Sequence, residues 1–270
     1  MRQSRLASLA LASVSTLALS AGARAQGTPP VYNWTGFYIG ANAGGAWGRS
    51  GTSTSLPCNN TTVPPAYLCR PGDPGEAPGV AVDGTGKVSG TGFTGGVQAG
   101  YNWQRGHWVY GLEADFGALD LRVSRQVTRQ YVAQNFPLFY TIANSAETDW
   151  LFTARGRIGW AVSNVLLYGT GGLAVTDLRT SNSFSDTELI AGSSWSNSQL
   201  KLGWTLGGGV EWGLNRNWTI KAEYLYVKFG SANAAGYITA PFGAQAYAEG
   251  ISTSVDLAAH IARAGINFRF

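Results

Sequence analysis

The stretch "GFTGGVQAGYNWQRGHWVYGLEADFGA", residues 92–118, contains two segments in which apolar and polar side chains alternate. One face of the two segments carries Phe93, Val97, Tyr101, Trp108, Leu112 and Phe116. The other face carries Gln98, Asn102, Glu113 and Asp115. A period of two predicts β-strands with one apolar side, and a separation of only a few residues predicts a hairpin.

Six further segments alternate in the same way: residues 34–48, 149–162, 164–175, 201–214, 217–229 and 256–270. The segment 164–175 is apolar on both faces, so its orientation stays open. The sequence therefore predicts eight strands, and the last of them continues to the final residue with Ile266, Phe268 and Phe270 on one face.

The connections between these segments alternate in length. Three are short, "QRGH", "SN" and "LNRN", and four are long, at roughly residues 49–89, 119–147, 176–199 and 230–253. This alternation is typical of outer-membrane barrels. Tryptophans that favour a membrane interface flank the short turns at positions 103, 108, 160, 212 and 218. We predict an all-β fold: an eight-stranded antiparallel up-and-down transmembrane β-barrel with short periplasmic turns and four long extracellular loops.

Composition supports export and excludes several other classes of protein. The 270 residues include only 13% charged side chains, and no mature stretch is apolar for the roughly 20 residues that a spanning helix needs. Residues 1–25 begin with basic residues, continue through an apolar run and end in Ala23-Arg24-Ala25, as in a cleaved signal peptide. The barrel domain is then 26–270, in the cell outer membrane. Cleavage lowers the formal charge from +4 to +1, which gives no reason to expect nucleic-acid binding.

Cys58 and Cys69 are the two cysteines, in the segment "LPCNNTTVPPAYLC". In an exported protein, a disulfide that closes this small loop is the default expectation. A metal site would need further ligands close by, so no metal site is predicted.

The segments "WTGFYIGANAGGAWG", "GGVQAGYNWQ", "LYGTGGLAV" and "INFRF" resemble the small outer-membrane β-barrel proteins of alphaproteobacteria, often called porin-like or outer-membrane immunogenic proteins. That family is related to the OmpA-type transmembrane domain. The resemblance implies a structural, surface-exposed barrel surrounded by outer-membrane lipid and lipopolysaccharide. It also implies that Phe268 and Phe270 form an assembly signal read by the barrel-assembly machinery. The long first loop with its two cysteines is not a general feature of the family.

Eight charged residues are predicted to face the barrel interior: Glu113, Asp115, Arg155, Arg157, Glu211, Lys221, Glu223 and Arg263. An eight-stranded barrel is only wide enough for its own side chains, so these charges should pair. We expect two linked clusters, one joining residues 113 and 115 to 155 and 157, the other joining 221 and 223 to 211 and 263. Breaking one cluster should raise the ion conductance of the barrel if that cluster is the plug. A small or gated pore lined by the same residues, or an active-site carboxylate pair, are the alternatives.

Two other motifs carry weaker signals. Residues 90–95 match G-x-G-x-x-G and residues 169–174 match its G/A variant, but a period-two segment follows the first instead of the helix that a dinucleotide fold requires. His260 has Asp256 four residues earlier, about 13 Å away along a strand, which is too far for a catalytic contact. The sequence therefore predicts no catalytic residue and no cofactor, and an outer-face barrel enzyme acting on lipid or peptide is the alternative function. The oligomeric state is left open.

Overall fold

Antiparallel strands make up nearly all of the described chain. The computed structural model describes residues 32–57, 68–69, 76–131, 138–187, 191–242 and 245–270, all within the unit Tyr32–Phe270. The elements are β1 (Gly36–Ser55), α1 (Glu76–Gly84), β2 (Gly86–Arg105), β3 (Trp108–Gln130), β4 (Phe139–Val162), β5 (Val165–Asp186), β6 (Gly192–Gly213), β7 (Trp218–Phe229), β8 (Ala232–Phe242), β9 (Gln245–Asp256) and β10 (Ala258–Arg269). The predicted signal peptide, residues 1–25, lies outside the described residues.

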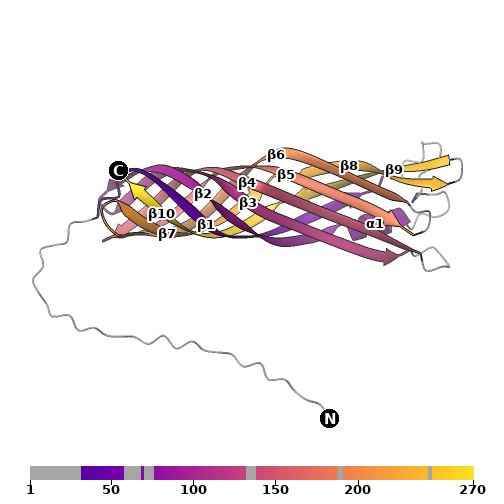
Figure 1. The fold of residues 1–270 in the computed structure, drawn as a ribbon, viewed down its shortest axis with the longest axis horizontal. Coiled ribbons are helices and arrows are strands. Elements are labelled where there is room, and N and C mark those ends of the chain that lie inside the picture. Colours follow the sequence, from indigo (N-terminus) through magenta and orange to yellow (C-terminus); the bar gives the residue numbers. More distant parts are fainter. Residues whose placement is uncertain (1–31, 58–67, 70–75, 132–137, 188–190, 243–244) are drawn as a thin grey trace, which may run out of the picture. The chain divides into compact units, whose positions relative to one another are not determined.

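Eight of these strands form a closed ring (Figure 1). Strands β1 to β6 each pair with the next in sequence, β7 pairs with β10, and β10 returns to β1 with Tyr38 opposite Arg269 and Gly48 opposite Ala259. A closed ring gives every strand a backbone partner on both sides, which a lipid environment demands. The prediction of an eight-stranded antiparallel barrel is confirmed.

Tight turns join the strands at one end of the ring. Gly106 and His107 connect β2 to β3, and Ser163 and Asn164 connect β4 to β5. Gly106 has a φ of 60° and Ser163 a φ of 55°, the left-handed conformation that lets a two-residue turn reverse a strand. The third turn occupies residues 214–217, so all three short turns are confirmed.

Three of the four long connections, 119–147, 176–199 and 230–253, are mostly strand, which corrects the prediction of long loops there. Strand β3 continues to Gln130 and β4 begins at Phe139, while the segment around 230–253 forms β8 and β9, which pair with each other and continue the wall above β7 and β10. In these extensions the apolar residues point inward and the polar ones outward: Leu121 is buried, whereas Arg122 is exposed. Apolar and polar residues therefore still alternate in these extensions, but the apolar face now points into the barrel. A pattern that requires an outward apolar face does not identify them as strands.

The nine-residue helix α1, which the sequence did not predict, lies between β1 and β2 and packs inside the outer end of the barrel. Its Val80 is buried beside Tyr140 and Ile142. Thr54 Oγ1 and Asn144 Nδ2 each donate a hydrogen bond to the carbonyl oxygen that ends the helix, both at 3.0 Å. No helix among the described residues is both long enough and apolar enough to cross a membrane.

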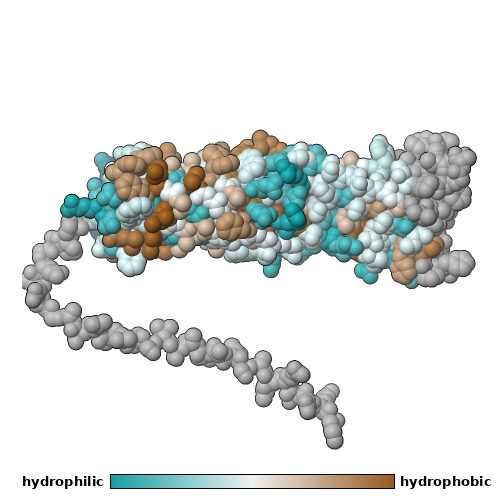
Figure 2. All heavy atoms as spheres, in the orientation of Figure 1, coloured by the Kyte–Doolittle hydropathy of each residue, from teal (hydrophilic) through white to brown (hydrophobic). Residues whose placement is uncertain are grey.

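A band of apolar side chains surrounds the half of the barrel that carries the short turns. On the face drawn in Figure 2, hydrophobic side chains gather near the C-terminus, and hydrophilic or neutral ones cover most of the remainder. The five tryptophans expected at the periplasmic interface lie near the short turns, with exposures between 41 and 51%: Trp103, Trp108, Trp160, Trp212 and Trp218. Half-exposed indoles at this level match a membrane–water boundary.

The interior is packed in layers along the barrel axis. Trp34, Val109 and Leu166 form an apolar cluster at the short-turn end. A polar and charged layer follows. Beyond it lies an apolar cluster of Ala46, Val88, Leu119, Leu121, Val123, Ala146, Leu151, Ala174, Leu178, Leu225, Val227, Phe229, Ala232, Val255, Leu257, Ala259 and Ile261. A further apolar cluster, which includes the helix, fills the outer end.

The structure also settles which face of the segment 164–175 points inward. Leu166 is fully buried in the lumen, while Leu167 is 56% exposed on the outer wall. Tyr168 and Thr170 follow Leu166 on the inward face.

Candidate functional site

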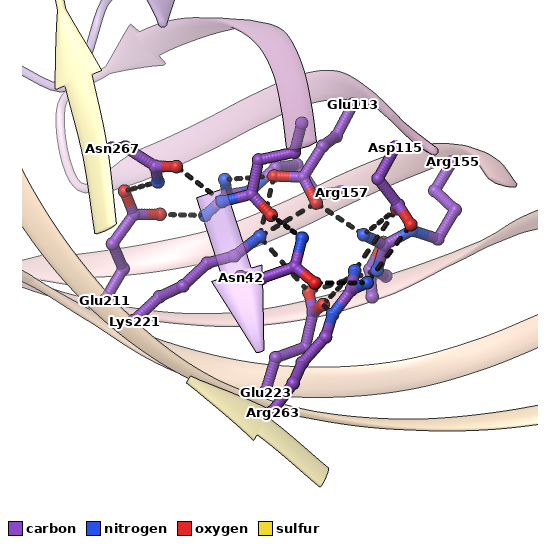
Figure 3. A network of polar contacts seen from close by, with 12 residues as sticks. Asn42, Glu113, Asp115, Arg155, Arg157, Glu211, Lys221, Glu223, Arg263 and Asn267 are labelled. Atoms are coloured by element: carbon purple, nitrogen blue, oxygen red, sulfur yellow. Dashed lines mark hydrogen bonds and ion pairs between the residues drawn. The ribbon is translucent and has the colours of Figure 1, made fainter. Parts of the chain in front are cut away.

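The charged layer holds the ionisable side chains of the interior, and five strands supply them. Strands β3, β4 and β7 each contribute two charges spaced two residues apart, which a period-two backbone projects to the same side. Strands β6 and β10 contribute one each. All eight predicted side chains lie here, each at most 4% exposed: Glu113, Asp115, Arg155, Arg157, Glu211, Lys221, Glu223 and Arg263. We call them the interior network (Figure 3).

Some of the ion pairs join neighbouring strands, as expected from the sequence. The Arg155 guanidinium contacts both Glu113 and Asp115 from the adjacent strand β3, with the contact to Asp115 at 2.9 Å. Arg263 contacts Glu223 across the β7–β10 pair at 2.7 Å. Opposite charges on the same face of adjacent antiparallel strands are close enough to bridge directly.

Other ion pairs cross the lumen, which corrects the expectation of two clusters. Lys221 Nζ lies 2.9 Å from Glu113 on the opposite wall, whereas the sequence predicted Glu211 as its partner. Arg157 instead reaches Glu211 at 2.6 Å across the width of β5. These contacts, and those of Arg155 with Glu223 at 3.0 Å and of Arg263 with Asp115 at 3.1 Å, join all eight residues into one network. The interior is narrow enough for long side chains to meet at its centre.

Uncharged partners complete the layer, and the sequence did not identify them as site residues. Tyr38 donates to Glu113 at 2.7 Å, Tyr168 to Glu223 at 2.9 Å, and Thr153 to Asp115 at 2.6 Å. Thr219 and Asn267 both donate to Glu211, at 2.6 and 2.9 Å. Most of these residues lie on the polar faces recognised in the sequence, so the same alternation could have found them.

A second polar group, made of amides, continues the layer toward β1 and β2. Asn42 Nδ2 donates to Gln98 Oε1 at 2.9 Å, and Gln98 Nε2 donates to Asn267 Oδ1 at 2.5 Å.

The Arg157 guanidinium also lies 4.1 Å from the centre of the Tyr168 ring, a cation–π distance. With four acids and four bases, the layer is electrically balanced and largely satisfied by its own hydrogen bonds.

The arrangement around His260 does not form an acid–histidine pair. His260 Nδ1 lies 2.5 Å from the Tyr224 hydroxyl, and its ring stacks on Trp47 at 5.9 Å. Asp256 instead accepts a hydrogen bond from Ser231. These contacts place His260 in an aromatic group on the outer wall.

The glycine motifs lie within strands β2 and β5. A Cβ on Gly92 would lie 1.8 Å from the Asp120 carbonyl oxygen, and one on Gly172 would lie 2.1 Å from the Ala154 carbonyl oxygen. These glycines therefore permit close approach of neighbouring backbones instead of forming a turn that cradles phosphates. Among the residues that the structure covers, no group of three or more potential ligands is arranged to hold a metal ion.

The predicted disulfide falls partly outside the structure. Cys69 is buried in the apolar cluster at the outer end. Cys58 lies outside the described residues, so its pairing with Cys69 stays a prediction.

Comparison with known proteins places this barrel in a family. A model of the outer membrane protein β-barrel domain matches residues 6–270. The 31 kDa outer-membrane immunogenic protein of Brucella melitensis is 32% identical over 243 residues, which cover 88% of this chain and 85% of that protein. A 22 kDa outer membrane protein of Rhizobium leguminosarum is 36% identical over 141 residues, 52% of this chain and 54% of that protein.

Three solved structures align with most of the chain at low sequence identity. Neisserial surface protein A aligns with 87% of this chain and 98% of its own at 13% identity, with a TM-score of 0.34. Ail of Yersinia pestis covers 84% of this chain and 98% of its own at 14% identity, with a TM-score of 0.31. The outer membrane protease OmpT of Escherichia coli covers 87% and 97% at 8% identity, with a TM-score of 0.44.

The family match covers nearly the whole chain, and both relatives are named as outer-membrane proteins, the Brucella protein as an immunogenic one. They support a structural, surface-exposed barrel located in the outer membrane. The chain belongs to the outer membrane β-barrel protein family.

Proposed function

We propose that this chain is a structural barrel of the outer membrane whose lumen is closed. The observation that carries the proposal is the interior network, in which eight charges of balanced sign contact one another while their side chains are almost fully buried. Charges that line an open aqueous pore remain hydrated and available to passing ions. Charges that form ion pairs with one another stabilise a plug instead.

The apolar layer beside the network adds a second barrier in series. Leu119, Leu178 and Leu225 come from three different strands and are fully buried in it. An apolar constriction excludes water even where charged groups lie close by. We therefore expect that breaking the network alone does not open the barrel, which differs from the expectation drawn from the sequence.

Planar-bilayer recording tests the proposal. Purified wild-type barrel should give no steady current, and neither should the Arg157→Ala variant, because the apolar layer stays in place. Leu112→Ala, on the exposed outer wall, serves as the control for insertion and handling. Steady wild-type current whose ion selectivity changes in Arg157→Ala would show that the network lines an open pore, and the proposal would be wrong.

The proposal includes a non-enzymatic role. In its support, His260 contacts Tyr224 and Trp47 while Asp256 contacts Ser231, so the histidine and acid that suggested a barrel enzyme make separate contacts. Incubation of the purified barrel with lipid and peptide substrates tests this part. Turnover that is lost in His260→Ala would overturn it.

The proposal also includes recognition of the last strand by the barrel-assembly machinery. Phe270 N donates to the Phe37 carbonyl oxygen at 3.1 Å, and the Phe270 ring is 69% exposed beside that of Phe37. The Phe270 ring is thus exposed at the β1–β10 closure, where a binding partner has access to it.

A further inference from the structure

The outer edge of the apolar band differs from one side of the barrel to the other. Strand pairing places Lys228 opposite Ala258. The register that pairs Gly48 with Ala259 and Gly51 with Asp256 places Arg49 opposite Ala258 on its other side. Arg49 and Lys228 therefore flank one small residue on the outer wall, with backbones about two strand spacings, or 10 Å, apart. Lys87 faces outward from the neighbouring strand β2.

These three cations have no ion-pair partner within the described ranges. On the wall formed by β3, β4 and β5, two outward cations have acidic partners: Arg122 lies 2.8 Å from Glu147, and Arg179 lies 2.9 Å from Asp149. On the wall formed by β1, β2, β7 and β10, the nearest outward acid along the register is Asp256, which accepts a hydrogen bond from Ser231. We call Arg49, Lys87 and Lys228 the basic sector. It carries three positive charges that contact no acid among the described residues.

Aromatic side chains lie directly below the basic sector. Trp47 and Tyr226 flank His260 in the next outward row, with the Trp47 ring stacked on His260 at 5.9 Å and the Tyr226 ring 5.1 Å from it. Aromatic residues at this level mark the boundary between hydrocarbon and polar headgroups. The cations just beyond the boundary are therefore at headgroup depth.

The wall further below is hollowed and apolar. A groove on the outer surface is lined by Ala43, Ala222 and Ala264, with Val210 and Ile220 beside them. Small side chains leave room there for a hydrocarbon chain to pack closely against the strands.

The wall above the basic sector carries hydroxyl groups. Ser53 lies opposite Ser254, and Ser55 opposite Ser252, across the β1–β9 pair, and all four face outward. Along one sector the barrel thus offers an apolar groove, then cations, then hydroxyls. A phosphorylated glycolipid presents acyl chains, phosphates and sugars in the same order.

We propose that the basic sector binds a phosphorylated glycolipid of the outer leaflet, the lipid A part of lipopolysaccharide, with a phosphate held between Arg49 and Lys228. The proposal rests on the location of the barrel in the outer membrane, and it does not depend on whether the lumen conducts. Guanidinium and ammonium groups bind phosphate through charge-assisted hydrogen bonds, which are strongest next to a low-dielectric region such as the acyl layer.

Native mass spectrometry of the detergent-solubilised full barrel, titrated with diphosphorylated lipid A, tests the site. The variant Arg49→Gln/Lys228→Gln should weaken binding at least tenfold. The matched control Arg122→Gln/Arg179→Gln removes the same charge from the opposite wall and should change binding less than twofold. Both variants alter exposed side chains, and their heat-modifiable migration on gels reports whether they are folded.

Three results would overturn the proposal. Equal weakening of lipid A binding by both variants would show that the lipid responds to the total charge of the barrel and not to the basic sector. Unchanged binding in Arg49→Gln/Lys228→Gln would place the lipid elsewhere. Wild-type binding of dephosphorylated lipid A or of phosphatidylglycerol as tight as that of diphosphorylated lipid A would show that the site does not select a phosphorylated glycolipid. A planar-bilayer current would count against the closed lumen and leave this test unaffected.

Discussion

Replacing Arg157 by alanine should strongly destabilise the barrel. Within the described residues, the only ion pair that Glu211 makes is with Arg157, at 2.6 Å, and both side chains are at most 3% exposed. The substitution leaves Glu211 in contact with two neutral donors, Thr219 and Asn267, and with no cation at ion-pair distance. Breaking one partner of a buried pair costs about 3–5 kcal/mol. At about 1.4 kcal/mol per factor of ten, the ratio of folded to unfolded barrel should fall by roughly two to nearly four orders of magnitude.

The cost should come from the carboxylate left behind, and a second substitution isolates it. Glu211→Gln keeps an oxygen that can accept from Thr219 and Asn267 while removing the charge. Adding it to Arg157→Ala should therefore recover at least half of the lost stability. Arg179→Ala is the matched control, because its pair with Asp149 is about half exposed and such pairs contribute about 0–1 kcal/mol.

Urea-induced unfolding of the barrel in lipid vesicles, followed by tryptophan fluorescence and by heat-modifiable migration, gives the free energies of unfolding. A loss for Arg157→Ala as small as that for Arg179→Ala would show that water or other groups satisfy Glu211. A double variant no more stable than Arg157→Ala would show that the orphaned charge is not the cause. Either result would refute the account of the interior network as a dry, mutually neutralised plug.

Four further outcomes are expected. Mass spectrometry of the exported protein should find it without residues 1–25; an intact N-terminus would contradict the cleavage site. Cys58→Ser should leave outer-membrane levels unchanged, since the predicted disulfide constrains only a loop of about a dozen residues, and a loss of assembly would show that it supports the barrel. Deleting Phe270 should lower outer-membrane levels, measured by fractionation. Gly92→Ala should impair folding because its Cβ would collide with a backbone carbonyl, whereas Gly51→Ala, with open space around it, should fold normally on the same gel assay.

Much of the membrane-embedded half could be predicted from the sequence because lipid imposes a simple rule there. An outward apolar face and an inward polar face alternate residue by residue, so Glu113 and Arg155 could both be assigned to the interior. The orientation of segment 164–175 could not be predicted in this way, since Leu166 and Leu167 are equally apolar and only closure of the ring decides which one points inward.

The cross-lumen pairs could not be read from the sequence for a different reason. Adjacent-strand partners follow from register, but the contact between Lys221 and Glu113 depends on the diameter of the closed ring and on side-chain reach. The strands of the outer walls could not be predicted because their apolar face points inward and their polar face outward, the reverse of the membrane-embedded half. Above the apolar band, water lies outside and the packed interior takes the apolar residues, so segments that look like polar loops are paired strands.

The reversal of the apolar face partway along the strands fixes the depth at which the barrel sits. Sliding inward by a single row would carry Arg49, Lys228 and Arg122 into hydrocarbon, and sliding outward would lift Trp103 and Trp218 into water. Either displacement costs free energy on every strand at once, because all eight are joined in one ring. The barrel should therefore keep a fixed insertion depth. Its outer walls and helix should stay at a constant height above the bilayer even where the local membrane thins or thickens.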